Sequence, residues 1–260
     1  MRVRVDNRHG SPPCRSCFRH PLWSGYTHFD RWDASTARTE CQRICACVRG
    51  AAAYNAHISD PGGCAMLELP ARETLAYVCH DMQNDYLKEG GRTPEAGRNP
   101  RTPQLIENHV RLLTAARAAG LPVFFTGHFL REDYLDAARH GRARSLGSLR
   151  DGTWGAEVID ELAPLPGEFL IRKGGGMSAF TGTALEKWLR RLGVSTLIVA
   201  GIATQAGVES TVRDARERDF DSIVVGDACD GRTENHEASL LNMGTFAQVV
   251  STEEVVAALG

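Results

Sequence analysis

The sequence has no hydrophobic run long enough to span a membrane, and its first residues lack the continuous apolar segment of a secretory signal. It contains no P-loop, and no GxGxxG motif follows the first strand-like run. These absences argue against a membrane protein, a secreted protein and a dinucleotide-binding enzyme. We therefore expect a cytoplasmic protein that works without a cofactor.

An excess of charge of either sign is also missing, because the net charge of the 260 residues is only −2. The balance differs along the chain. Residues 1–65 hold nine arginines, no lysine and five acidic residues, whereas the remainder holds 21 basic and 27 acidic residues. The larger part is thus mildly acidic and unsuited to nucleic acid. We expect neither nucleic acid nor a membrane as a partner.

Residues 1–65 show no sustained helical or strand periodicity. They could supply thiolates to zinc, but the cysteine spacing matches no zinc module, so we expect no metal. We expect a disordered extension, or an upstream stretch preceding a true start at Met66, with one domain over residues 66–260. Six of the eight cysteines lie in this segment: Cys14, Cys17, Cys41, Cys45, Cys47 and Cys64.

From residue 75 onward, apolar strand-like runs alternate with amphipathic helical stretches. This alternation predicts an α/β fold with three layers, in which helices cover both faces of a six-stranded, mostly parallel sheet. Residues 130–165 fit the pattern poorly and are interpreted as a surface excursion over one end of the sheet. The predicted strands are 75–80, 121–126, 169–172, 196–200, 222–226 and 247–250, and the predicted helices are 103–119, 183–192, 208–218, 234–245 and 252–259.

Three of the predicted strand ends carry sequence motifs. The first strand ends in His80 and continues as D-x-Q-x-D-Y from Asp81 to Tyr86. The third is followed by K-x4-S-A-F-x-G-T from Lys173, and the fourth by G-I-A-T-x-x-G-V-E-S-T, which includes Gly207. Parallel sheets bind ligands at the carboxyl ends of their strands, so these motifs are expected to meet.

Together, and in this order, the three motifs resemble the isochorismatase-like hydrolases, a superfamily that includes nicotinamidases, N-carbamoylsarcosine amidases and isochorismatase. The resemblance runs from about residue 75 to residue 256. It implies that Asp81 is a general acid or base supported by Lys173. It also implies an oxyanion site in the turn that precedes the helix, often beside a cis peptide near Ile202 and Ala203.

Most members of that superfamily carry a nucleophilic cysteine where this chain has Gly207. Cys79 and Cys229 lie on other elements, where they are expected to be small buried residues, and cannot replace it. A covalent cysteine intermediate at this position is therefore excluded. The glycine is expected to leave open space for a larger or carboxylated substrate.

We expect a hydrolase of a small, carboxylated metabolite that cleaves a vinyl-ether C–O bond or a C–N bond without a covalent cysteine intermediate. The alternatives are an inactive homologue that binds a small ligand, and an amidase that uses water activated by Asp81. A homo-oligomer is expected from the resemblance. Asp81, Lys173 and Gly207 are the candidate catalytic residues, and the candidate substrate contacts are Gln83, Tyr86, His128, Phe180, Ala203, Thr204 and Gln205.

Some of these residues also have a simpler interpretation. Gln83 and Asp85 are typical of groups that support a turn. His128 could line the pocket or bind a metal, but Gly127 precedes it and no second histidine follows closely, so a metal is not expected. Asp227 is expected to anchor a loop.

Overall fold

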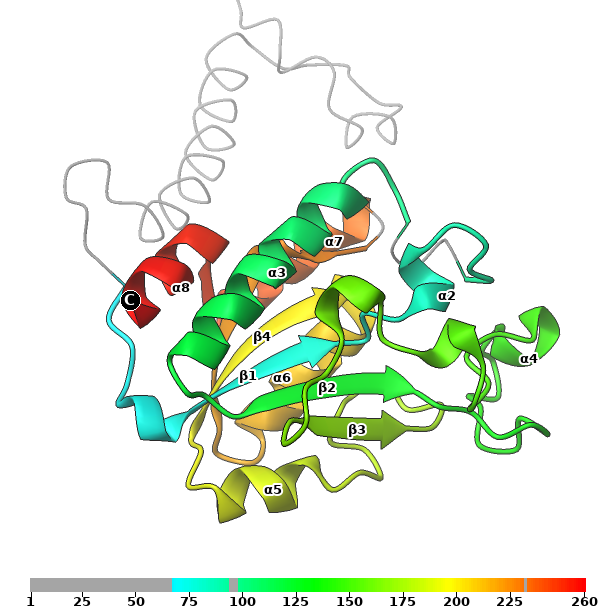
Figure 1. Ribbon diagram of the computed structural model, residues 1–260, viewed down its shortest axis with the longest axis horizontal. Coiled ribbons are helices and arrows are strands. Elements are labelled where there is room, and N and C mark those ends of the chain that lie inside the picture. The colour runs from blue at the N-terminus through cyan, green and yellow to red at the C-terminus, as the bar shows by residue number, and fades with distance from the viewer. Residues whose placement is uncertain (1–66, 94–97, 232) are drawn as a thin grey trace, which may run out of the picture. The chain divides into compact units, whose positions relative to one another are not determined.

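The computed structural model describes residues 67–93, 98–231 and 233–260, so the expectations for residues 1–65 lie outside the described residues. Its centre is a six-stranded sheet with the order β3-β2-β1-β4-β5-β6, in which every neighbouring pair is parallel (Figure 1). The predicted α/β architecture is therefore confirmed. The strands are β1 Leu75–His80, β2 Val123–His128, β3 Phe169–Lys173, β4 Thr196–Ile202, β5 Asp221–Asp230 and β6 Gln248–Val250.

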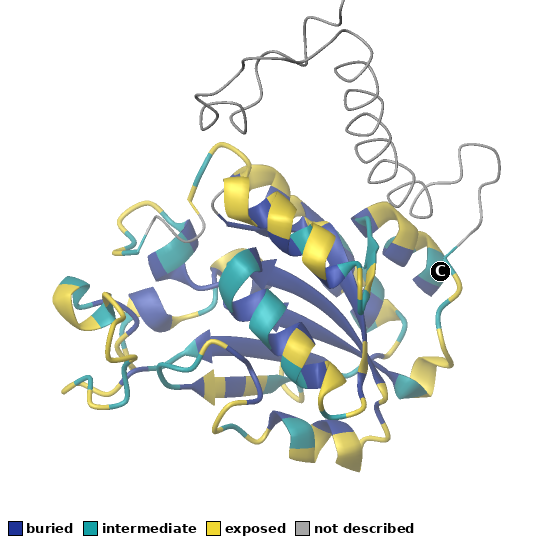
Figure 2. Cartoon of the chain, turned by 180° about the vertical axis from the view of Figure 1, so that it is seen from behind, coloured by how far each residue is buried: buried dark blue, intermediate teal, exposed yellow. Residues whose placement is uncertain are grey.

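Helices cover both faces of the sheet, and each face has its own hydrophobic core. On one face α3 and α8 pack against alternate strand residues such as Tyr77 and Phe125, and on the other α5, α6 and α7 pack against Val78 and Phe124. Figure 2 shows the buried strands between helices whose outer sides are exposed. The helices are α2 Asn84–Leu87, α3 Thr102–Ala118, α4 Ala143–Leu146, α5 Leu185–Arg191, α6 Glu209–Arg216, α7 Thr233–Met243 and α8 Thr252–Leu259.

The strand order places a topological switch between β1 and β4. The chain runs outward from β1 through β2 to β3, and then returns to the centre and runs outward the other way from β4 to β6. In open parallel sheets, ligands usually bind outside the carboxyl ends of the strands at such a switch. Asp81 follows β1 and the 203–207 turn follows β4, so both stand at the switch point.

Element boundaries differ from the sequence predictions mainly at the carboxyl edge. Strand β5 continues to Asp230, four residues beyond the predicted end, and the register between β4 and β5 shifts between Val199 and Gly201. Helix α3 begins at Thr102, one residue before the predicted start, and the Thr102 hydroxyl accepts the Asn99 N–H. Trp188 of α5 is 37% exposed and packs against Phe169 at the edge of the sheet.

Residues 130–165 are only partly a surface excursion. Arg139 to Gly141 and Trp154 are exposed, as expected of a covering segment. Ile159 and Leu162, however, are fully buried in the core on the α3 side. The segment is therefore attached to the domain by its own hydrophobic contacts.

Within the described ranges, no helix is long and apolar enough to cross a membrane. Cys79 and Cys229 are both buried and free, as the sequence predicts.

Candidate active site

Asp81 stands at the carboxyl end of β1 in a left-handed backbone conformation, with φ of 53°. This conformation is uncommon for a residue other than glycine, although aspartate tolerates it better than most. The Asp81 N–H donates to the carbonyl of Thr126 at the end of β2, and the Asp81 carbonyl accepts the Gln83 N–H. The turn thus fixes the carboxylate at the sheet edge.

The Asp81 carboxylate is held mainly by a lysine from β3. Lys173 Nζ lies 2.7 Å from Oδ2, and Thr126 Oγ1 donates to Oδ1 at 2.9 Å. Two imidazoles flank the same carboxylate, with His128 Nε2 at 3.3 Å and His80 Nδ1 at 3.4 Å from Oδ2. The register of the strands explains why these side chains lie together, because His80 pairs with Thr126 and His128 pairs with Lys173 across adjacent strands.

Asp81 and Lys173 form a buried ion pair, with exposures of only 3% and 1%. Lys173 Nζ also donates to the carbonyl of Met177 at 2.7 Å, so its charge is well satisfied. Burial acts to raise the pKa of Asp81, but the adjacent His80, Lys173 and His128 outweigh it and hold that pKa below its usual range. Asp81 is therefore a carboxylate at neutral pH, which makes it a proton acceptor.

The turn after β4 faces this carboxylate. It contains a cis peptide bond between Ile202 and Ala203, at the place that the resemblance indicates. Gly201 has φ of 140°, and a Cβ there would lie 2.0 Å from the His80 carbonyl oxygen, so only glycine fits beside β1. The chain then forms a π-helical turn over Thr204–Val208 and continues as α6. The amino end of this helical segment lies at the carboxyl edge of the sheet, where the N–H groups of Ala206 and Val208 donate to the carbonyl of Ala203.

The space beside Gly207 is not open, and the expectation of room for a substrate there is wrong. A Cβ on Gly207 would lie 2.4 Å from Cε1 of His80, 3.0 Å from Nδ1 and 3.3 Å from Nε2. His80 is fully buried, and its imidazole fills the volume that a side chain at position 207 would take. Gly207 itself is also buried.

Four of the seven candidate substrate contacts are partly exposed, namely Tyr86, His128, Ala203 and Gln205. The rings of Tyr86 and His128 meet edge to face at 6.5 Å, and the Nδ1 of His128 donates to the carbonyl of Gly174. Burial raises the pKa of Tyr86, and Asp81 and Asp85 raise it further, so its hydroxyl stays protonated. The Oε1 of Gln205 has no hydrogen-bond partner within the described part of the chain.

The other three candidate contacts are buried, and the structure gives them other roles. Gln83 is fully buried and uses its amide to hold the backbone of His128 and the carbonyl of Ala156. The Thr204 hydroxyl bonds to Nδ1 of His236, and Phe180 packs in the core against Phe220. Each is thus already engaged inside the protein, and their role as direct substrate contacts stays a prediction.

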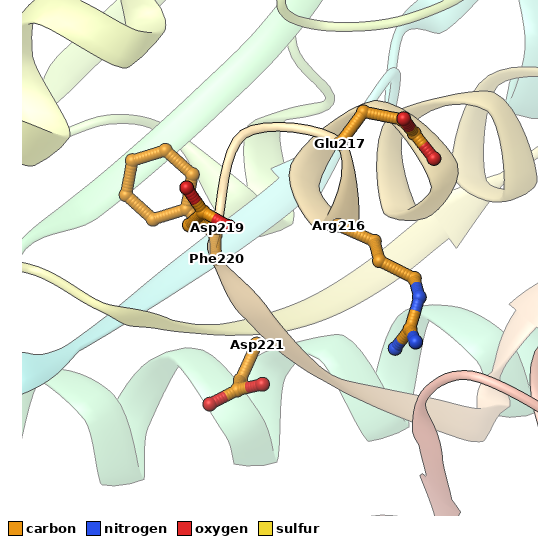
Figure 3. Close-up of a pocket in the computed structure, with 5 residues that line it drawn as sticks. All are labelled: Arg216, Glu217, Asp219, Phe220 and Asp221. Atoms are coloured by element: carbon orange, nitrogen blue, oxygen red, sulfur yellow. The ribbon is translucent and has the colours of Figure 1, made fainter.

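Asp85 and Asp227 have the supporting roles that their positions suggest. Asp85 accepts the N–H groups of Arg92 and Leu149, and Asp227 accepts from the backbone and the hydroxyl of Thr252 at the start of α8. A shallow pocket elsewhere lies at the amino end of β5, on the edge of the sheet opposite Asp81. It is lined by Arg216, Glu217, Asp219, Phe220 and Asp221 (Figure 3).

Sequence reasoning missed the part that His80 plays. A histidine in the last position of a buried strand, next to a candidate catalytic aspartate, is the signal that could have found it. The motif positions alone do not show that the imidazole reaches Gly207. That contact depends on the side of the sheet to which His80 points and on the path of the turn after β4.

The comparisons with known proteins agree with this arrangement. Residues 75–254 match the model of the isochorismatase domain. Ureidoacrylate amidohydrolase RutB from Acinetobacter baylyi is 34% identical over 200 residues, covering 70% of this chain and 81% of that protein. The protein of the same name from Methylobacterium radiotolerans is 35% identical over 201 residues, covering 70% of this chain and 77% of that protein.

Solved structures show the same fold. A cysteine hydrolase from Pseudomonas syringae pv. phaseolicola superposes with a TM-score of 0.68 at 25% identity, covering 76% of this chain and 98% of that one. N-carbamoylsarcosine amidase from Thermoplasma acidophilum superposes with a TM-score of 0.59 at 27% identity, covering 69% and 97%. With a matching domain over most of its length and an α/β site of this form, the chain belongs to the isochorismatase family of hydrolases.

Proposed function

We propose that this protein hydrolyses a C–N bond, in an amide or ureido group of a small carboxylated metabolite, with a water molecule that Asp81 activates. The observation that carries the proposal is the state of Asp81, a buried carboxylate paired with Lys173 at 2.7 Å at the switch point of the sheet. A carboxylate in this state can accept a proton from water. Position 207 offers no side chain that could attack in its place.

The reaction then takes one water and forms no bond to the protein. Asp81 accepts a proton from the water as the oxygen attacks the carbonyl carbon, which gives a tetrahedral oxyanion. The backbone N–H groups at the start of the 204–216 helical segment stabilise the negative charge on that oxygen. The C–N bond breaks, and the proton held by Asp81 passes to the departing nitrogen.

Lys173 supports the reaction by keeping Asp81 ionised. Its three donors face Asp81 and the carbonyls of Met177 and Gly176, so it is already satisfied within the protein. We infer that Lys173 balances the charge of Asp81, and that the carboxylate of the substrate is bound elsewhere. The positive end of the 204–216 helical segment favours such an anion.

The ureido class is favoured by the relatives, which are named ureidoacrylate amidohydrolases. A ureido acid combines a carboxylate with a C–N bond and several N–H donors. A vinyl-ether substrate would instead need a proton donor at carbon, and the lowered pKa of Asp81 disfavours that role.

A panel of substrates tests this proposal on the full-length protein. It contains N-carbamoyl amino acids and 3-ureidoacrylate, the corresponding simple amides, and carboxylated vinyl ethers. We expect release of ammonia or amine from the ureido acids, with weaker or no turnover of the uncharged amides. Turnover of the vinyl ethers alone would contradict the proposal, and so would the absence of turnover across the whole panel.

A further inference from the structure

The imidazole of His80 occupies the place where a nucleophilic side chain at position 207 would stand. The nearest ring atom is 2.4 Å from a Cβ built on Gly207, which is closer than any real contact of that kind. Because both positions are buried, neither side chain could relieve the overlap by turning towards solvent. An imidazole at 80 and a side chain at 207 therefore exclude each other in this backbone.

Hydrogen bonds fix the protonation and orientation of this ring. Nδ1 lies 3.1 Å from the carbonyl oxygen of Ile202, which can only accept, so Nδ1 carries the proton. Nε2 lies 3.0 Å from Thr211 Oγ1, which itself accepts the N–H of Ala179 and therefore donates its own proton to Nε2. The network needs a neutral ring, and burial lowers the pKa of His80 to about 4.

The same Nδ1–H also faces the Asp81 carboxylate, at 3.4 Å from Oδ2. An aliphatic side chain would fill the volume beside Gly207 without two buried polar atoms that require partners. Here each polar atom has a partner on a different element, Ile202 at the end of β4 and Thr211 on α6. The ring thus ties the turn after β4 and helix α6 to the residue next to the catalytic carboxylate.

We propose that His80 is a positioning residue for the Asp81 carboxylate, and that position 207 carries glycine to make room for its imidazole. The positioning part rests on the function proposed for Asp81, whereas the pairing with Gly207 does not. In this arrangement the imidazole of His80 contacts the carboxylate and occupies the place that the thiol would take in related enzymes with a cysteine. Water is then the nucleophile.

The pairing of His80 with Gly207 is tested by a cycle of Gly207→Ala, His80→Ala and the double variant, followed by thermal unfolding. Gly207→Ala overpacks the site and should lower the Tm by roughly 2–12 °C. In the His80→Ala background the same change should cost at most a few degrees, since the ring it meets is gone. Equal costs of Gly207→Ala in both backgrounds would overturn the pairing.

Gly226 provides the matched control glycine. It lies on β5, and a Cβ there would meet Val249 and Leu240 at 3.3–3.4 Å and would not contact His80. The cost of Gly226→Ala should therefore be the same with and without His80→Ala. A cost that changes with His80 would show that the cycle reports a general loosening of the fold.

The positioning role is tested first without any substrate, by ¹⁵N NMR of the histidine rings. The His80 ring should be neutral from pH 7 down to about pH 5, with its proton on Nδ1, and the Nδ1–H signal should move in the Asp81→Asn variant. The titratable groups that act on this ring are Asp81, Lys173 and His128. A proton on Nε2, or a signal indifferent to Asp81→Asn, would overturn the positioning role.

Kinetics on the ureido acid that is turned over fastest give the second readout. His80→Val should lower kcat by about tenfold or more with little change in KM, because a misplaced base reacts slowly in a bound complex. His80→Asn places an amide N–H where Nδ1–H stands and should recover most of the loss. Equal kcat in His80→Val and the wild type would contradict the positioning role while leaving the hydrolase proposal intact.

Discussion

Replacing Asp81 with asparagine is expected to lower kcat by about 10²–10⁴-fold, the usual contribution of a general base. Asparagine keeps the size of the carboxylate and can still accept hydrogen bonds from Thr126 and Lys173. It cannot take a proton from water, so the loss should fall on the chemical step and leave KM nearly unchanged. The measurement is steady-state hydrolysis of the best ureido acid, with circular dichroism to confirm the fold.

Asp227→Asn is the control for this experiment. Asp227 is another aspartate of the sheet, but its carboxylate accepts hydrogen bonds from Thr252 at the start of helix α8. The variant should keep wild-type kcat. If Asp81→Asn retained more than half of the activity, Asp81 would not be the base.

Replacing Lys173 with methionine is expected to have the largest effect on stability. The change leaves the Asp81 carboxylate buried without its counter-charge, and breaking a buried ion pair in this way costs about 3–5 kcal/mol. For a domain of this size, that corresponds to a fall in Tm of roughly 6–20 °C. Thermal unfolding at pH 7 measures it.

The pH dependence of this loss identifies its cause. Without Lys173, one of the groups that oppose the effect of burial is lost, so the pKa of Asp81 should rise in the folded state. A carboxyl group whose pKa is higher in the folded than in the unfolded state destabilises the folded protein at neutral pH, and this effect disappears at low pH, where the group is protonated in both states. The difference in Tm between the wild type and Lys173→Met should therefore shrink as the pH falls. Lys88→Met is the control, because Lys88 pairs with Glu161 at the surface and should matter by about 1 kcal/mol or less. A Lys173→Met deficit no larger than that would contradict the ion pair.

The fold and the core of the site could be predicted because they follow from local patterns. Apolar runs mark the strands, and parallel strands bring their carboxyl ends together, so Asp81 and Lys173 were expected at one edge although 92 positions separate them. The end of β5 was missed because residues 227–230 alternate little in polarity. Their strand conformation comes from pairing with Gly201 and Ile202 of β4.

The roles of individual polar residues could not be predicted in the same way. Gln83 and Thr204 belong to motifs that look exposed to ligand, yet their partners lie on β2 and on α7, far away in sequence. Gly207 was interpreted as empty space because a sequence shows the absence of a side chain but not which neighbour fills the gap. The imidazole of His80 fills this gap, so the glycine makes room for an imidazole and not for a substrate.

The central claim is that water, activated by Asp81, attacks the substrate directly. A single-turnover reaction in H₂¹⁸O, with enzyme in excess over the best ureido acid, tests it most directly. The carbonyl of a ureido group leaves as carbamate and then CO2, whose oxygens exchange with the solvent, so the label is read in the protein. We expect no ¹⁸O in the peptide that contains Asp81 after the first turnover. One ¹⁸O atom in the Asp81 carboxylate would show that Asp81 is a covalent nucleophile and would contradict this mechanism.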